Sequence, residues 1–146
     1  MIRTHLRRSL RYLPAFVAGS IFTALTCAAP SEPVVDVLIE TDTTIIGQQF
    51  EYPEGRAKIT AAIVTVPPHA ALKRHRHPVP LFGYVLDGEL TVYYGEAGER
   101  TYRTGDSLVE AFNTPHQGRN NGKENVKILV VYAGADGVPN TVVEES

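Results

Sequence analysis

The sequence predicts an all-β fold, an antiparallel sandwich or barrel, for residues 29–146. Short runs of residues rich in β-branched and aromatic side chains, which favour strands, recur along this region. Clusters of Gly, Pro, Asn and Asp separate the runs, as turns do between neighbouring strands. The sequence shows no repeat, heptad pattern or low-complexity segment that would favour a solenoid or a coiled coil. Many short strands with such spacing are typical of packed or closed antiparallel sheets.

The expected strands follow one another along nearly the whole domain. They are residues 34–39, 43–50, 58–66, 81–86, 89–94, 100–103, 107–110 and 127–132. Asp87-Gly88 separates two of them, and this dipeptide predicts a tight hairpin over residues 84–92. Residues 34–39 and the tail at 138–143 have no obvious place in a minimal barrel. We interpret both as edge strands that pair with a second subunit, which predicts a homodimer.

Residues 1–28 have the pattern of a secretory signal peptide. The first eleven residues carry four arginines and no acid, residues 12–25 are mainly apolar, and small residues follow up to Ala28. Cleavage after Ala28 would release residues 29–146 as a single exported domain, which we place in the periplasm. Arg7-Arg8 also resembles a twin-arginine signal, which would allow a metal to be loaded before export.

Two alternatives for this leader stay open. Cys27 lies in a sequence that resembles a lipoprotein box, so that the thiol would be lipidated. Alternatively, residues 12–29 are just long enough to remain as an uncleaved membrane anchor. A membrane is therefore expected as a partner only through a lipidated or uncleaved N-terminus.

Loss of the leader makes the chain acidic. Four of the 14 Lys and Arg residues lie in the first 28 residues, which leaves 10 basic residues against 16 acidic ones, a formal net charge of −6. The one basic cluster, residues 73–77, is short, so nucleic acid is excluded as a partner. Because Cys27 is the only cysteine, a cleaved protein has no disulfide, no cysteine nucleophile and no thiolate metal site.

His75 and His77 form the pattern on which the functional prediction rests. Residues i and i+2 of an extended segment point to the same face, so the two imidazoles can converge on one ion. Spacing of this kind is weak evidence alone, and the structural alternative is a basic surface loop at residues 73–77. The residues that follow favour the metal site.

These residues occur in a specific order. They are His75-Arg76-His77, then Tyr84-Val85-Leu86-Asp87-Gly88, then Gly105-Asp106, then Pro115-His116 and finally Asn120. This order resembles the two motifs of the cupin superfamily, over about residues 69–120. The resemblance implies a small single-domain cupin, whose fold is a jelly-roll β-barrel, also called a double-stranded β-helix.

The sequence departs from the cupin pattern at three places. Leu81 stands where the first motif usually carries a metal-binding glutamate, and a leucine cannot bind a metal. His69 replaces an expected glycine, and Ala111-Phe112-Asn113 replaces Pro-x-Gly. Asn113 tolerates the left-handed backbone that glycine would supply, and His69 tolerates it less well.

The resemblance places His75, His77 and His116 in one barrel interior as ligands of a single divalent metal ion. Three imidazoles leave open coordination positions, which a catalytic site requires. Imidazole suits Zn, Fe, Cu and Ni, and the resemblance adds Fe and Mn, so the metal's identity stays open. By the same resemblance, Asn120 closes the second motif, where it supports backbone or the second nitrogen of a histidine rather than touching substrate.

Glu110 is the candidate for the carboxylate that Leu81 does not supply. Strand alternation places it with Leu108, just before the turn that leads to His116. It is predicted to be either a fourth metal ligand or a general base; the alternatives are a structural pair with an interior arginine, or exposure to solvent. Pocket walls are predicted from Leu81, Phe82, Tyr84, Phe112 and Tyr132, with Tyr84 or Tyr93 able to offer a hydroxyl to a ligand.

Two classes of function fit these features. The first is a metal-dependent enzyme for a small organic molecule, such as an oxygenase, isomerase or lyase. The second is a non-catalytic periplasmic module that binds or senses a small ligand or a metal, because one fold hosts many chemistries. A storage or structural role with an empty barrel is the third alternative. The histidines at positions 75, 77 and 116 argue against it, because they match the metal-binding positions of the cupin motifs.

Overall fold

The computed structural model describes residues 32–145, and its contacts divide the chain into two units after Val35. All strands lie in the second unit, which begins at Asp36. Within residues 32–145 the sole helical element is the 3₁₀ turn η1 (Gly95–Ala97), and none of these residues forms a helix able to cross a membrane. The predicted signal peptide, Cys27 and the alternative anchor lie outside the described residues.

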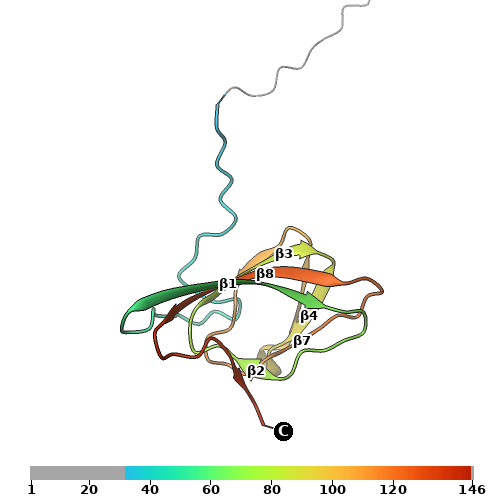
Figure 1. The fold of residues 1–146 in the computed structure, drawn as a ribbon. Helices are drawn as coiled ribbons and strands as arrows, with labels where there is room; N and C mark the ends of the chain where they lie inside the picture. The colour runs from blue at the N-terminus through green and yellow to red at the C-terminus, as the bar shows by residue number, and fades with distance from the viewer. Residues whose placement is uncertain (1–31, 146) are drawn as a thin grey trace, which may run out of the picture. The chain divides into compact units, whose positions relative to one another are not determined.

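Nine strands form the framework of the described domain (Figure 1). They are β1 (Ala57–Val66), β2 (His75–Arg76), β3 (Leu81–Asp87), β4 (Glu89–Tyr93), β5 (Glu99–Arg103), β6 (Ser107–Val109), β7 (Gln117–Arg119), β8 (Val126–Ala135) and β9 (Val142–Val143). One sheet has the order β1-β8-β3-β6, a second has the order β5-β4-β7, and β2 pairs with β9. All these strand pairs are antiparallel, so the all-β prediction is confirmed.

The longest ladder joins β1 and β8, from Ala57 opposite Ala135 to Val66 opposite Val126. Alternate side chains of a strand point to opposite faces, and β3 shows this alternation most clearly. On β3 the inner face carries Leu81 and Val85, and both are buried. The inner faces of the two larger sheets together form one apolar core. Its buried members are Val66, Leu81, Val85, Leu90, Val92, Tyr94, Tyr102, Leu108, Ala111, Val126, Ile128 and Val130.

The Asp87-Gly88 turn is a corner between two sheets, and the predicted hairpin is wrong. β3 ends at Asp87 and pairs with β8 and β6, whereas β4 begins at Glu89 and pairs with β5 and β7. Gly88 has a φ of 84°, and a Cβ there would lie 3.1 Å from a methyl group of Val126. The Asp87-Gly88 dipeptide therefore predicts the positive φ of Gly88 correctly. The turn at this position connects two sheets instead of two paired strands.

Six of the predicted strands are present as β1, β3, β4, β5, β6 and β8. The predicted strand at residues 34–39 is wrong: no strand forms there, and the Leu38 carbonyl accepts a hydrogen bond from the Ser107 hydroxyl at 2.7 Å. Residues 43–50 contain only an isolated bridge between Thr43 and Gln49. The tail does form a strand, β9, which pairs with β2 of the same chain.

Candidate metal centre

A backbone ladder brings the distant histidines together. His75 and His116 lie directly opposite each other in an antiparallel bridge. The His75 amide donates to the His116 carbonyl at 3.0 Å, and the His116 amide donates back at 2.8 Å. Two residues along, the His77 carbonyl accepts from the Asn113 amide at 2.8 Å. The short β2 strand is thus joined to the loop that carries His116, and both imidazoles of β2 and its extension face that loop.

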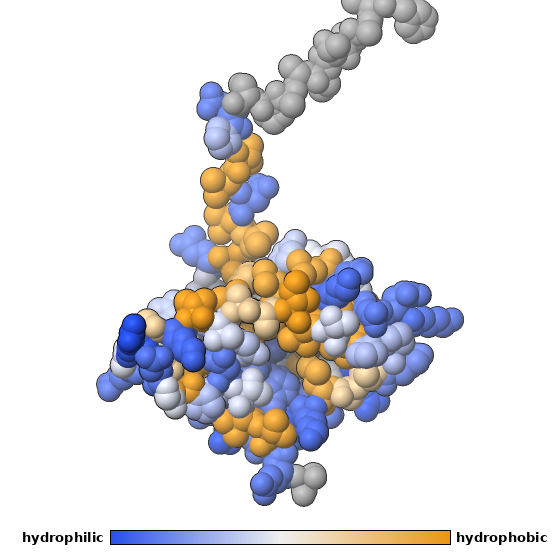
Figure 2. All heavy atoms as spheres, in the orientation of Figure 1, coloured by the Kyte–Doolittle hydropathy of each residue, from blue (hydrophilic) through white to orange (hydrophobic). Residues whose placement is uncertain are grey.

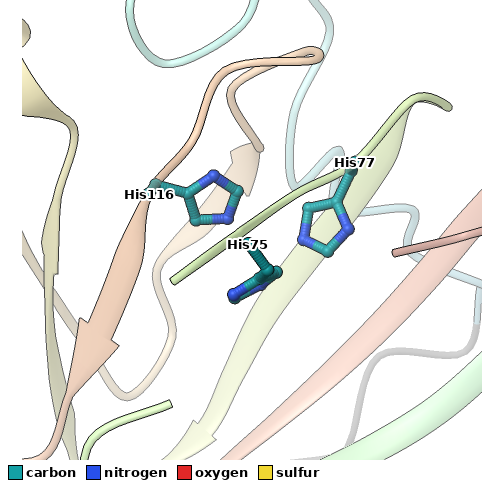
Figure 3. Close-up of side chains that lie close together, drawn as sticks. All are labelled: His75, His77 and His116. Carbon is teal, nitrogen blue, oxygen red and sulfur yellow. The ribbon is translucent and has the colours of Figure 1, made fainter. Parts of the chain in front are cut away.

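The three imidazole rings converge on one point, as predicted (Figure 3). Their centroids are 4.6 to 5.1 Å apart, and one ligand nitrogen from each ring lies within 4.8 Å of the others. His77 is 4% exposed and His116 is 3% exposed, whereas His75 is half-buried. The half-buried ring therefore lies on the more open side of the group.

Hydrogen bonds orient all three rings in the same way. Nδ1 of His75 lies 2.7 Å from the Lys73 carbonyl, and Nδ1 of His116 lies 2.9 Å from the Thr114 carbonyl. Nδ1 of His77 lies 2.9 Å from the Asn140 carbonyl. A carbonyl can only accept, so each Nδ1 carries the proton and each Nε2 presents its lone pair. This is the tautomer that a metal-binding imidazole requires.

Burial favours the neutral form of the His75 and His77 imidazoles, because it lowers the pKa of both. It lowers the pKa of His77 to about 4, against the backbone hydrogen bond that raises it. Burial also lowers the pKa of His75, and the neighbouring His116 adds to that effect. Neutral imidazoles at neutral pH do not have to lose a proton before they bind a cation.

The arrangement fits a divalent metal ion. Zinc–nitrogen bonds of about 2.0–2.1 Å in a tetrahedral site place two nitrogens roughly 3.4 Å apart. The ligand nitrogens here lie within 4.8 Å of one another, so modest ring rotations would close the group around an ion. The described part of the chain supplies no fourth member to this group, which leaves coordination positions for a substrate or water.

Glu110 lies next to the three histidines but is not a member of the converging ligand group. It follows β6, is 9% exposed, and its Oε1 accepts a hydrogen bond from the Ala111 amide at 2.8 Å. Its Oε2 lies 3.8 Å from Nε2 of His116. The predicted burial of this acid is correct, and the side chain beside its carboxylate is the His116 imidazole rather than an arginine.

The site opens into an apolar cavity of about 80 Å³. Of the residues expected as pocket walls, Leu81 and Tyr132 line the cavity. Phe82, Tyr84 and Phe112 do not line it. Phe82 and Tyr84 lie outside the cavity because the inner face of β3 is occupied by Leu81, Gly83 and Val85. The side chains between these residues point to the opposite face of the strand. No Lys or Arg side chain is among the residues that line the cavity.

Two buried tyrosines near the site were not predicted. The hydroxyl groups of Tyr94 and Tyr102 lie 2.9 Å apart, and Tyr102 lines the cavity. Burial raises the pKa of both hydroxyls, and the Glu110 carboxylate raises that of Tyr94 further. Strand alternation from Leu90 would have identified Tyr94 as inward-facing. The neighbouring Tyr93, which was predicted as a ligand contact, is 45% exposed and lies off the cavity.

Asn120 supports backbone and touches no histidine. It is 1% exposed, its Nδ2 donates to the carbonyls of Val66 and Glu124, and its Oδ1 accepts from the Gly122 amide. Asn120 was predicted to support either the backbone or the second nitrogen of a histidine, and its hydrogen bonds are of the first kind. His69 and Asn113 both adopt positive φ, of 60° and 48°, at the two places where the cupin pattern has glycine.

Comparisons with solved structures show the fold. The DMSP lyase DddQ from Ruegeria pomeroyi has a TM-score of 0.51 at 24% identity, over 58% of this chain and 42% of the lyase chain. A protein with a double-stranded β-helix domain from Klebsiella pneumoniae has a TM-score of 0.51 at 18% identity, over 82% of this chain and 84% of that one. At such identities the likeness concerns the fold alone.

An oxalate decarboxylase from Lactobacillus farciminis matches less closely, with a TM-score of 0.49 at 26% identity. That match covers 58% of this chain and 26% of the decarboxylase. The chain thus spans less than half the length of the lyase and about a quarter of the length of the decarboxylase.

A comparison with curated proteins finds no match. Residues 62–132 match the cupin domain family, and this segment contains β2 to β7, most of β8 and all three histidines. This family match supports the cupin superfamily, and the described strands have the all-β cupin fold.

Proposed function

We propose that this cupin binds one divalent metal ion through His75, His77 and His116 and acts on a small organic molecule. The observation that carries the proposal is the convergence of three Nε2 atoms, each with its Nδ1 proton held by a carbonyl, at an apolar cavity. A bound metal would supply Lewis-acid activation of a substrate oxygen or of water. Such activation serves the oxygenase, isomerase and lyase reactions that the sequence predicts as alternatives.

The cavity limits the substrate. A volume of about 80 Å³ admits a molecule of only a few non-hydrogen atoms beside the histidines. Because the lining contains no Lys or Arg, an anionic group on the substrate has no cationic side chain to pair with in the cavity. The apolar lining also excludes water from the reacting atoms. A small keto or enol compound that binds through an oxygen atom fits these conditions, and a carboxylate would need the metal ion as its cationic partner.

We propose that Glu110 acts as the general base. One carboxylate oxygen is held by the Ala111 amide, and the other is 3.8 Å from the His116 Nε2, beside the ligand group. The second oxygen is placed to take a proton from a molecule bound at the open positions. The role of fourth ligand is the alternative outcome of the test below.

Metal content tests the site. We expect one divalent ion per chain in the purified protein, its loss in His75→Ala and His116→Ala, and its retention in Glu110→Gln. The control is His69→Asn, since His69 is exposed and lies outside the group. Retention of metal in both histidine variants would end the metal hypothesis, and loss in Glu110→Gln would make that residue a ligand.

A non-catalytic binding or sensing module is the second candidate, and Leu81 favours it. Leu81 is 5% exposed and lines the cavity where a cupin usually carries a ligand glutamate. Small keto, enol and carboxylate compounds can be screened in parallel for oxygen consumption, for product formation and for a shift in melting temperature. Thermal shifts without turnover in the metal-loaded protein would favour the binding module.

We propose that the protein is exported to the periplasm as residues 29–146. The support is the sequence pattern of residues 1–28, with its basic start, apolar centre and small residues before the cleavage point. Cell fractionation and mass spectrometry of the mature N-terminus test this proposal. A chain that begins at Ala29 agrees with it, a lipidated Cys27 indicates a lipoprotein, and an intact N-terminus indicates an anchor.

We propose a homodimer that forms through β1. This strand is an edge of its sheet, so one side of its backbone has no strand partner in the described residues. Ile59 and Ile63 on its outer face are 67% and 62% exposed, and Figure 2 shows apolar side chains over this sheet. Antiparallel pairing of two β1 strands centred on Ala61 would place Ile59 of each copy opposite Ile63 of the other.

Light scattering tests the dimer. We expect a dimer mass for the wild type, a monomer mass for Ile63→Lys, and a dimer mass for Thr101→Lys, a control on β5. Thr101 is exposed on the other large sheet. A monomeric wild type would refute the dimer, and a dimeric Ile63→Lys variant would refute the β1 interface.

A further inference from the structure

The end of the chain returns to the histidine group. We call residues 138–144 the C-terminal strap. Its strand β9 pairs with β2, with Val143 opposite His75 and Val142 opposite Arg76. The pairing continues one residue further, where the Glu144 amide donates to the Arg74 carbonyl at 2.9 Å. The strap thus runs along the strand that carries the first histidine.

An ion pair fastens the strap to β2. The Arg76 guanidinium donates to the Glu144 carboxylate at 3.0 Å, and their side chains are 38% and 29% exposed. At the other end, the Val138 amide donates to the Ala135 carbonyl at 3.1 Å. Contacts at both ends therefore determine where the strap's backbone lies.

The strap supplies the hydrogen bond that orients His77. Its Asn140 carbonyl lies 2.9 Å from Nδ1 of His77, and its Thr141 hydroxyl lies 3.2 Å from the same atom. His75 and His116 each use the carbonyl two residues earlier in the sequence, so local backbone orients them. His77 differs because its acceptor comes from 63 residues away.

This difference has a chemical consequence. The Asn140 carbonyl accepts the Nδ1 proton of His77 and so leaves Nε2 free to bind a cation. Without such an acceptor, a neutral imidazole prefers its proton on Nε2, the nitrogen that has to bind the metal. The other two rings would keep their tautomer, since their acceptors do not depend on the strap.

We propose that the C-terminal strap is a positioning element that holds His77 in its metal-binding tautomer and orientation. This inference rests on the proposed metal site. It assigns a role to a tail that is not needed to complete either of the two larger sheets. Loss of a partner that orients a ligand typically costs about 10- to 100-fold in metal affinity, and we expect a loss of that size.

Two truncations test the strap. One ends at Gly137 and removes it, and the matched control ends at Glu144 and keeps it. Two-dimensional NMR of the imidazole nitrogens in the metal-free protein reports the tautomer of each histidine, and titration reports Zn²⁺ affinity. We expect the chain ending at Gly137 to gain the Nε2–H tautomer at His77 alone and to bind Zn²⁺ about 10- to 100-fold more weakly.

A substitution covers the case in which the shorter chain does not fold. Glu144→Lys places a cation opposite Arg76, and Glu145→Lys is the control at the exposed neighbouring residue. Only the first variant is expected to change the His77 tautomer and Zn²⁺ affinity. An unchanged tautomer and affinity in Glu144→Lys and in the folded truncation would overturn the proposal. The tautomer needs no metal, so a wild type without Zn²⁺ affinity would refute the proposed function separately.

Discussion

Acid is expected to destabilise the metal-free protein through His77. Burial lowers the pKa of this imidazole to about 4 in the folded protein, against an ordinary value of 6.5. Below about pH 6.5 the unfolded chain binds a proton at this position that the folded chain does not bind, so the free energy of unfolding falls. The loss of stability begins as the pH falls below about 6.5, the unfolded pKa, and is complete once the pH is below about 4, the folded pKa.

The two pKa values determine the size of the effect. The interval from 6.5 to 4 corresponds to about 3 kcal/mol when both states are fully titrated. At about pH 5 the same linkage amounts to about 2 kcal/mol, because the unfolded imidazole is then almost fully protonated and the folded one is not. A loss of this size is a large part of the stability of a small domain.

Urea denaturation of EDTA-treated protein at about pH 7.5 and about pH 5 measures this loss. His77→Gln removes the titrating group and serves as the reference, since other groups titrate in both proteins. We expect the wild type to lose about 2 kcal/mol more than His77→Gln between the two pH values. Equal losses in the two proteins would refute the argument that His77 is buried in its neutral form.

Three substitutions test the framework around the site by urea denaturation at neutral pH. Tyr94→Phe breaks the 2.9 Å hydroxyl contact with Tyr102 and should cost about 1 kcal/mol, whereas no change would mean that the contact contributes nothing. Asn120→Ala removes the three hydrogen bonds of a buried side chain and should cost about 2–4 kcal/mol; a cost below about 1 kcal/mol would contradict its backbone role. Gly88→Ala should cost about 2–3 kcal/mol, and Gly95→Ala about 1 kcal/mol. Both glycines have a positive φ, but only at position 88 would the added Cβ contact neighbouring atoms.

The longer strands were predictable because each satisfies one simple pattern. Strands β1, β3 and β8 are rich in Val, Ile and Leu, and the inner residues of β3 and β8 alternate with outer ones. The two-residue strands β2 and β9 carry no such pattern, since their pairing depends on contacts between residues about 68 apart, such as Arg76 with Glu144. The Asp87-Gly88 turn could be predicted only in part for the same reason. The dipeptide indicates the positive φ of Gly88, but it does not indicate which strands pair on either side of the turn.

The histidines were predictable to different degrees. The spacing of His75 and His77 indicates a shared face, but only the resemblance to cupins connects them with His116. The register that places His75 opposite His116 arises from the tertiary structure. The choice of Phe82 and Tyr84 as pocket walls was wrong because aromatic character does not reveal the face, whereas Gly83 on the inner face opens space for the cavity.

Substitution of Leu81 tests whether a side chain at position 81 can reach the proposed metal ion. Leu81→Glu restores the carboxylate of the cupin pattern, at a residue whose carbonyl already accepts a hydrogen bond from the Glu110 amide at 2.9 Å. In metal-free protein the change should cost about 2 kcal/mol or more, because it removes a buried apolar side chain and places a second acid near Glu110. A bound cation would offset that repulsion and gain a ligand.

We therefore expect Zn²⁺ to raise the melting temperature of Leu81→Glu more than that of Leu81→Gln, which has the same shape without the charge. The comparison is made within each variant, between EDTA-treated and Zn²⁺-loaded protein, so the cost of losing leucine cancels. Leu81 and the three histidines line the same cavity, and a carboxylate at position 81 should therefore reach the ion. Equal Zn²⁺-induced shifts in the two variants would mean that position 81 lies beyond its reach, and the site would then bind metal through imidazoles alone.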